Sequence, residues 1–228
     1  MNYYDNYIKI KNSVHETAIK ASRDPGSIRI VSVSKTFSHE TVQQAIDSGI
    51  KIFGENKIQE AKSKIPLLTG NFEFHMIGHL QSNKAKDAVK LFTLIHSIDT
   101  LSTAEKVNKE AEKLGKTQDI LIQINSSGEE SKSGISAAEA VHLAGNILKL
   151  NNLNLKGIMT IGPLTDNESD IRKAFKLTKQ TLDIINIELG LSLKELSMGM
   201  SDDYLTAVEE GATILRIGSA IFGRRFYQ

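Results

Sequence analysis

The alternation of short β-type runs with helical stretches constrains the fold of this chain more than any other feature. Eight runs rich in β-branched and apolar residues recur, and each is followed by residues with helical character. They span residues 28–34, 50–53, 72–77, 92–98, 119–125, 153–160, 193–198 and 213–217. Strands separated by helices pair in parallel, because right-handed crossovers place a helix between neighbours. We therefore expect an α/β fold with a parallel sheet.

The number of units favours a barrel over an open sheet. Eight strand–helix units can close into a TIM-type (β/α)8 barrel, which needs at least about 200 residues, and this chain has 228. A doubly wound open sheet with the same alternation is the alternative. No Gly/Ser-rich linker interrupts the sequence, so we expect residues 1–228 to form one barrel domain with no second domain.

Periodicity and capping signals place the helices. An extra N-terminal helix precedes the first strand, since Tyr7, Val14, Ala18 and Ala21 recur at helical spacing before Pro25-Gly26 ends the element. The later helices are expected to begin near residues 38, 55, 82, 101, 136, 171, 201 and 219.

Charge and cysteine content narrow the classes of function. The formal net charge of +1 gives no bias toward a nucleic-acid or membrane partner. The chain has no cysteine, which excludes disulfides and thiolate metal sites. Residues 1–11 lack the apolar core of a signal peptide, and no run approaches the roughly 18 apolar residues of a membrane span. We therefore expect a cytoplasmic protein.

Lys35 is the first candidate for chemistry. Active sites of such barrels lie at the C-terminal ends of the strands, and Lys35 directly follows the run IRIVSVS at 28–34. A lysine amine that is partly desolvated there is a competent Schiff-base nucleophile. The alternative is an ordinary strand-end lysine whose amine reaches solvent, and position alone favours that alternative.

Residues 216–225 (RIGSAIFGRR) are typical of a phosphate site. Gly218 allows close approach of the backbone, Ser219 supplies a hydroxyl, and the N-terminus of the following short helix offers unpaired N–H groups. The loops after strands seven and eight often bind phosphate in this fold, and residues 197–201 (SMGMS) would form the other wall. The alternative is a glycine-containing turn that only ends a strand.

Two further patterns remain open. His75 and His79 have a spacing that binds zinc when it lies on a helix. Here the pair spans a predicted strand end without an evident third ligand, so we expect no metal. His79, near the barrel mouth, would contact a ligand or cap the helix that begins at Ser82. Residues 126–133 (SSGEESKS) are expected to form a solvated loop or a lid.

Lys35, the phosphate-type turn and the segments between them together resemble a known family. The matching segments are VSVSKTF (31–37), FGENKIQEAKSK (53–64), FHMIGHLQSNK (74–84), HSID (96–99), GEESKSG (128–134), GIMT (157–160) and SMGMSDDYLTAVEEGATILRIGSAIFG (197–223). In order and number they closely resemble the pyridoxal 5′-phosphate (PLP) homeostasis protein family. These proteins are also known as YggS or PROSC proteins and are related to the N-terminal barrel of alanine racemase.

The resemblance implies a cofactor and a set of residues that bind it. Lys35 would carry PLP as a Schiff base. Ser201, Gly218 and Ser219 would hold the phosphate, with the backbone of Met200 near it. Together with His79, which is included for its place near the mouth, the predicted cofactor-binding residues are Lys35, Asn56, His79, Met200, Ser201, Arg216, Gly218 and Ser219.

The resemblance also implies roles for Arg216 and Asn56, and two positions depart from the family pattern. Arg216 falls where the related racemases place an arginine by the pyridine nitrogen, which implies a ring-side or phosphate-side role. Asn56 would lie near the ring. The family usually has an aromatic residue where this chain has Lys57, and MTMPP where it has MTIGP with Gly162. These departures concern the rim of the pocket.

The family implies a PLP-binding protein without established turnover. It would carry or buffer PLP through Lys35 and regulate intracellular vitamin B6 and amino-acid homeostasis, with no catalytic residue. Its partners would be PLP and other B6 vitamers, with PLP-requiring apoenzymes as candidate recipients. We expect a monomer or a weak dimer.

Enzymatic alternatives stay open. A PLP-dependent amino-acid racemase or decarboxylase of the same barrel type needs a second acid/base at the substrate. Alanine racemases take that group from an added C-terminal β-domain and a dimer interface. The printed chain ends at Gln228, just after the eighth strand, so we expect no such domain. A lysine-dependent aldolase or phosphosugar enzyme without PLP would also suit Lys35, but the segment matches disfavour it.

Overall fold

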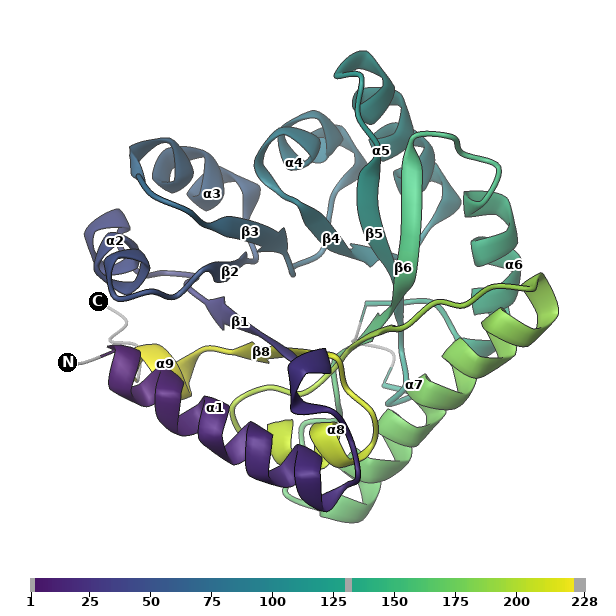
Figure 1. Cartoon of the computed structure of the whole chain (residues 1–228). Helices are drawn as coiled ribbons and strands as arrows, with labels where there is room; N and C mark the ends of the chain where they lie inside the picture. The colour runs from purple at the N-terminus through teal and green to yellow at the C-terminus, as the bar shows by residue number, and fades with distance from the viewer. Residues whose placement is uncertain (1–2, 130–132, 224–228) are drawn as a thin grey trace.

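The eight predicted strands are present and pair in sequence order in a closed parallel barrel, which confirms the predicted fold class (Figure 1). The computed structural model describes residues 3–129 and 133–223. The strands are β1 (Arg29–Val33), β2 (Ile52–Glu55), β3 (Glu73–Met76), β4 (Leu94–Ile98), β5 (Gln118–Ile124), β6 (Leu153–Thr160), β7 (Glu195–Ser197) and β8 (Ile214–Ile217). The pairing of β8 with β1, from Arg29↔Ile214 to Ser32↔Ile217, closes the barrel.

Helices surround the barrel and alternate with the strands (Figure 1). The α-helices are α1 (Tyr3–Lys20), α2 (His39–Asp47), α3 (Ile58–Lys64), α4 (Ala85–Leu91), α5 (Leu101–Lys113), α6 (Ala137–Ile147), α7 (Glu168–Leu189), α8 (Tyr204–Glu209) and α9 (Ser219–Phe222). Short 3₁₀ turns are η1 (Pro25–Ser27), η2 (Ile65–Leu67) and η3 (Ser82–Lys84). The capping box of Ser136 and Glu139 begins α6, as its sequence signal predicts.

The second unit differs most from the sequence-based boundaries. The strand was expected at 50–53 and the helix from about Glu55, whereas β2 runs to Glu55 and α3 begins at Ile58. The strand continues because Gly54 and Glu55 pair with β3, at Gly54↔His75 and Glu55↔Met76. The carboxyl group of Glu55 is fully buried by partners from neighbouring elements, so tertiary contacts override its helix propensity.

Three other boundaries shift for identifiable reasons. α1 ends at Lys20, before the expected stop at Pro25-Gly26, which lies in η1. β7 does not extend to Leu193, since the side-chain amide of Asn186 accepts from Leu193 N (2.8 Å) and donates to Leu193 O (3.0 Å). α8 begins at Tyr204 rather than near Ser201, whose hydroxyl instead accepts two backbone N–H groups from the segment after β8.

The barrel interior is layered. Near the N-terminal ends of the strands, an apolar layer fills the centre and is made of Val31, Leu94, Leu121, Met159 and Ile214. On β4, β5 and β8 the next inward positions are the buried polar residues His96, Gln123 and Arg216, and above them the interior opens at the C-terminal ends of the strands. A separate and larger apolar core lies between the sheet and the helices. The apolar layer therefore closes the barrel below the cavity at its C-terminal mouth.

Helix α1 packs beside α8 and α9 on the outside of the barrel (Figure 1). Asn6 Nδ2 donates to Ile221 O (2.9 Å), and the rings of Tyr3 and Phe222 lie 5.6 Å apart. Arg23 donates to Val208 O and Ala212 O at 2.5 and 2.8 Å. The extra N-terminal helix therefore fixes the short helix that follows β8.

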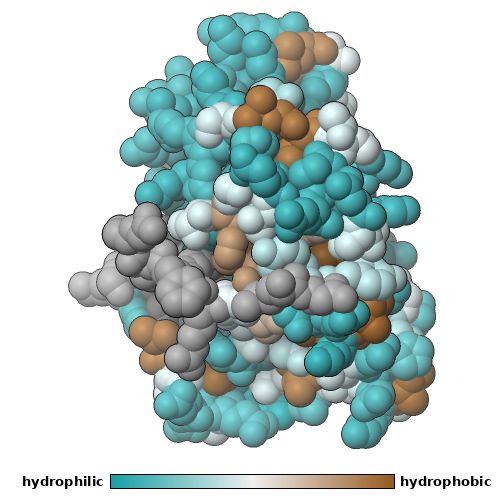
Figure 2. Space-filling model, turned by 90° about the vertical axis from the view of Figure 1, so that its left-hand side faces the viewer, coloured by the Kyte–Doolittle hydropathy of each residue, from teal (hydrophilic) through white to brown (hydrophobic). Residues whose placement is uncertain are grey.

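The molecular surface in Figure 2 is mainly hydrophilic, with apolar side chains in separate patches. No helix in the described ranges is both long and apolar enough to cross a membrane. Residues 130–132 of the expected loop or lid at 126–133, and Arg224 and Arg225 of the phosphate-type segment, lie outside the described residues.

Candidate cofactor site

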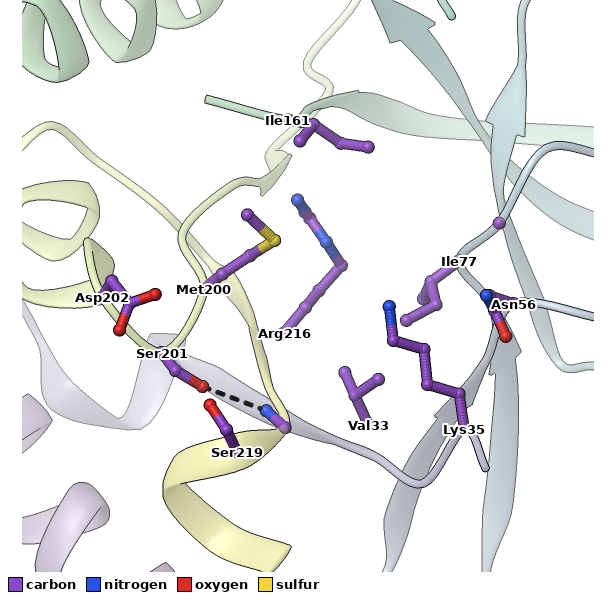
Figure 3. Close-up of a pocket in the computed structure, with 12 residues that line it drawn as sticks. Val33, Lys35, Asn56, Ile77, Ile161, Met200, Ser201, Asp202, Arg216 and Ser219 are labelled. Carbon is purple, nitrogen blue, oxygen red and sulfur yellow. Dashed lines mark hydrogen bonds between the residues drawn. The ribbon is translucent and has the colours of Figure 1, made fainter. Parts of the chain in front are cut away.

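A cavity of about 350 Å³ lies at the C-terminal mouth of the barrel (Figure 3). Side chains from several strand ends meet there, as expected for this fold. The lining residues are Val33, Lys35, Asn56, Ile77, Gly78, Ile161, Met200, Ser201, Asp202, Arg216, Gly218 and Ser219. All the predicted cofactor-binding residues except His79 are among them, although their role in binding stays a prediction.

Lys35 lies in a tight turn directly after β1. Phe37 N donates to Ser34 O (3.1 Å), which closes the turn around Lys35 and Thr36. The inward positions of β1 alternate, so Lys35 continues the row of Val31 and Val33 into the cavity. Figure 3 shows its amine extending from the turn toward the centre of the site. The side chain is half-buried rather than fully solvated.

A buried ionic cluster holds this turn from behind. Lys64 Nζ donates to Ser34 O (2.9 Å), to Glu55 Oε1 (2.6 Å) and to Glu60 Oε1 (3.0 Å). Ser34 Oγ also donates to Glu55 Oε1 (2.7 Å). Glu55 is 0% exposed and Lys64 4% exposed. Burial raises the pKa of the Glu55 carboxyl, and the charge and hydrogen bonds of Lys64 oppose that rise.

Thr36 adopts a backbone conformation that β-branched residues rarely adopt. Its φ is +71°, in the left-handed region where such side chains are strained. Its N–H donates to Glu60 Oε1, the oxygen that also accepts from Lys64. The ionic cluster therefore supports both ends of the Lys35 turn, and strain of this kind persists only where the surroundings over-determine it.

The opposite wall offers hydroxyl and backbone groups. Gly218 N and Ala220 N donate to Ser201 Oγ at 3.3 and 3.4 Å, and Ser219 begins α9 beside them. Figure 3 shows Ser201 and Ser219 facing the same side of the cavity, across from Lys35. The structure thus brings together the residues that the sequence predicts as a phosphate site.

Arg216 forms the floor of the cavity. It is 4% exposed and donates from Nη1 to Ser197 Oγ (2.7 Å) and from Nη2 to Thr160 O (2.8 Å). Burial lowers the pKa of the Arg216 guanidinium to about 10, against the opposing charge of Asp203. The group therefore stays protonated at neutral pH and can only donate hydrogen bonds.

Asn56 and Gly78 meet at the edge of the cavity. A Cβ atom on Gly78 would lie 2.2 Å from Asn56 O, so only glycine allows the two backbones this approach. The Oδ1 atom of Asn56 is buried and has no hydrogen-bond partner among the described residues. Figure 3 shows the nitrogen end of the Asn56 amide nearer Lys35, so it is the amide Nδ2 of Asn56 that faces the site.

His79 is the predicted residue that the structure leaves out of the cavity lining. Its Nδ1 lies 3.4 Å from Asp99 Oδ2, on a half-exposed ring. His75, four positions earlier, points into the barrel and contacts His96 instead. The two histidines therefore have different partners, and residues 3–129 and 133–223 hold no group of three or more metal-binding side chains. Gln81, not His79, occupies the N-cap position of η3.

The two departures from the family pattern lie outside the lining. Lys57 is exposed at the start of α3. Gly162 is buried, and a Cβ atom there would lie 3.1 Å from Asp203 Oδ2 and 3.3 Å from Phe175 Cε1. A larger residue at this position would need small shifts of both neighbours. A larger residue at position 162 would therefore affect the site by moving Asp203, whose charge acts on Arg216.

Sequence reasoning missed the apolar part of the lining. Val33, Ile77 and Ile161 line the cavity, yet in the sequence they are indistinguishable from core residues. The signal that could have found them is the alternation of inward and outward side chains along a strand. Val33 and Ile77 lie two residues after the buried inward residues Val31 and His75.

Comparison with known proteins agrees with this geometry. The family model described as the N-terminal domain of alanine racemase matches residues 15–225. The pyridoxal phosphate homeostasis protein of Aquifex aeolicus is 36% identical over 228 residues, all of both chains. The one from Vibrio alginolyticus is 40% identical over 216 residues, 91% of each chain.

Solved structures give the same result. PipY of Synechococcus elongatus, with PLP bound, has a TM-score of 0.81 at 31% identity, over 92% of this chain and 100% of that one. Alanine racemase of Clostridium difficile has a TM-score of 0.75 at 16% identity, and the match covers 98% of this chain but 57% of the racemase. That second likeness concerns the fold alone. The chain therefore belongs to the alanine racemase N-terminal domain family and, within it, to the pyridoxal phosphate homeostasis proteins.

Proposed function

We propose that this protein binds PLP covalently through Lys35 and carries or buffers it, as part of vitamin B6 and amino-acid homeostasis. One observation carries the proposal. Lys35 is the one lysine that lines the cavity in the described part of the chain, and Ser201, Gly218 and Ser219 form the facing wall. An amine and a set of phosphate-binding groups on opposite walls match the two ends of PLP. The bound PLP in the structure of PipY supports the same assignment.

The residues present fit this cofactor. A volume of about 350 Å³ lies at the lower end of the usual range for small-molecule sites, about 300–1,000 Å³. Asn56 lines the cavity beside Gly78, where a Cβ atom would clash with the Asn56 backbone, and its side-chain amide would lie near the ring. When bound, PLP supplies an aldehyde that amines attack and a pyridine ring that accepts electrons.

The chain's own residues would each take one task. Lys35 supplies the amine that holds the cofactor, and the Ser201 and Ser219 hydroxyls with Gly218 N would bind phosphate. Arg216, which stays protonated, would face the ring. Because an arginine only donates, it would leave a pyridine nitrogen unprotonated and so weaken the ring as an electron sink.

The ionisable groups of the lining favour a carrier over an enzyme. Racemases and decarboxylases need a second acid/base within reach of the substrate. Apart from Lys35, the ionisable side chains that line the cavity within residues 3–129 and 133–223 are Asp202 and Arg216. Asp202 is exposed at the rim, and Arg216 is held by two hydrogen bonds in its protonated form.

The first expected result is a change in colour. Addition of PLP to the purified protein should give a visible absorption band, because conjugation of the cofactor to an amine extends its chromophore. Reduction with borohydride should then fix the cofactor to the Lys35 peptide, as peptide mass spectrometry would reveal. If no band remained on the protein after unbound PLP had been removed by dialysis, the assignment of PLP would be refuted.

The second expected result is the absence of useful turnover. With PLP loaded, the exchange of α-protons of common amino acids into heavy water should stay well below about 1 s⁻¹, the low end of usual enzyme rates. NMR of each amino acid measures this rate directly. Stereospecific exchange above that value would favour the racemase or decarboxylase alternative.

We also propose that PLP-requiring apoenzymes receive the PLP, that the protein is a monomer or a weak dimer, and that it is located in the cytoplasm. A single barrel over residues 1–228 would suffice to hold the cofactor, because the lining residues of the cavity come from the barrel strands, the loops that follow them and the first residue of α9.

A further inference from the structure

A chain of buried polar side chains lies inside the barrel below the cavity. Arg216 Nη1 donates to Ser197 Oγ (2.7 Å), Ser197 Oγ lies 2.9 Å from His96 Nδ1, and His96 Nε2 lies 3.1 Å from His75 Nδ1. The four residues come from β8, β7, β4 and β3. Each is at most 4% exposed. The proposed carrier function makes no use of the three residues beyond Arg216.

The direction of every hydrogen bond among these side chains follows from Arg216, the first of them. Arginine has no acceptor, so the Ser197 oxygen accepts from Arg216. The proton of the buried Ser197 hydroxyl then needs an acceptor. Among the described residues, His96 Nδ1 is the other hydrogen-bond partner of that hydroxyl, so His96 Nδ1 must be unprotonated.

The same reasoning continues through the two imidazoles. A neutral His96 with a bare Nδ1 carries its proton on Nε2 and donates it to His75 Nδ1. His75 Nδ1 is then the acceptor, so its proton lies on Nε2. That nitrogen faces the N-terminal end of the barrel, 3.6 Å from Glu73 Oε1.

The surroundings of His96 disfavour its protonation. Burial first, and then the charges of Arg216 and Arg29, lower the pKa of His96 well below its usual value. Protonation of His96 at Nδ1 would also reverse its bond to Ser197. His75 borders a cavity of about 200 Å³, whose charged lining is Arg29 from β1, Glu73 from β3, Asp119 from β5, Lys156 from β6 and Glu195 from β7. The neutral form of His75 therefore follows from its place as the acceptor of the His96 Nε2 proton.

We propose that Ser197, His96 and His75 are positioning residues for Arg216. Each of these residues accepts a hydrogen bond from the one before it, beginning at Arg216, and both histidines are neutral Nε2–H tautomers. This series of hydrogen bonds sets the orientation in which Arg216 faces the cofactor cavity. The effect on the cofactor rests on the proposed function, whereas the tautomers do not.

Nitrogen NMR of the histidine side chains tests the tautomers without PLP. The chain has six histidines, and the two buried ones, His75 and His96, should show the neutral Nε2–H pattern at neutral pH. His96 should also not titrate between about pH 5 and 8, where histidines ordinarily titrate. A proton on Nδ1 of His96, or titration of His96 in that range, would overturn the proposal. This measurement decides it even if the protein binds no PLP.

Two matched variants test the effect on the cofactor. Ser197→Ala removes the link between Arg216 and His96, and we expect the apparent Kd for PLP to rise about tenfold, within the usual cost of a charged hydrogen bond. The His96 nitrogen signals should shift as well. Ser97→Ala is the control, because Ser97 is equally buried and its hydroxyl has no partner among the described residues.

The comparison of the two variants has a clear outcome. Weaker PLP binding and shifted His96 signals in Ser197→Ala, with neither change in Ser97→Ala, support the positioning role. Unchanged PLP affinity in Ser197→Ala, or an equal loss in Ser97→Ala, would overturn it. Thermal unfolding of both variants verifies that each is folded when it is measured.

Discussion

Replacing Lys35 with alanine should abolish the covalent binding of PLP and leave the barrel folded. The cavity is lined by one lysine in the described part of the chain, so no second amine is placed to take over. PLP retained after dialysis should fall to background, and borohydride should fix none. The free energy of unfolding should change by only about 0.5 kcal/mol, because a half-exposed side chain leaves no large buried cavity.

A second lysine serves as the control for this experiment. Lys57 follows β2, is exposed and does not line the cavity. Lys57→Ala should therefore retain the full absorption band and the reduced adduct. If Lys35→Ala kept the same reducible adduct, or Lys57→Ala lost it, the assignment of the attachment site to Lys35 would be wrong.

Replacing Lys64 with methionine should give the largest loss of stability that we predict. Lys64 is the cation that pairs with the fully buried Glu55 (2.6 Å). Its removal leaves an uncompensated buried carboxylate, which costs about 3–5 kcal/mol of unfolding free energy. Urea unfolding followed by circular dichroism measures the change. PLP binding should weaken as well, since Lys64 also holds Ser34 O at the start of the Lys35 turn.

The double variant Glu55→Gln/Lys64→Met separates charge from packing. A neutral glutamine can still accept the hydrogen bond of Ser34 Oγ, so most of the stability should return when both partners are replaced. A double variant as unstable as Lys64→Met alone would show that the loss comes from packing. The prediction for the single variant would then have the wrong cause.

The pH dependence of Lys64→Met provides an independent check. Burial already raises the pKa of Glu55, and loss of Lys64 removes the main opposing influence. The folded variant then binds a proton at Glu55 more tightly than the unfolded chain, whose carboxyl has a pKa of about 4.3. Its stability should therefore rise as the pH falls from about 8 to about 5. A stability loss that is the same at both pH values would contradict this account.

The sequence predicts the barrel and most of the cavity, because both follow from regular spacing. Lys35 and Arg216 stand at inward positions near strand ends, and parallel closure brings such positions together. The contact of His75 with His96 has no local signal, since it depends on the register between β3 and β4. The burial of Glu55 has no local signal either, because its partner Lys64 lies nine residues later, at the end of α3.

The contacts between the two ends of the sequence bear on when the cavity exists during folding. Lys35 follows the first strand and Ser219 follows the last, and β1 pairs with β8 to close the ring. Contacts between segments so distant in sequence form late and slow the folding of a chain. A nascent chain lacks the facing wall until β8 has been synthesised, so PLP would be captured only by the completed barrel. Ligand that binds only the native state adds to its stability, so bound PLP would stabilise the closed barrel after its last strand has paired.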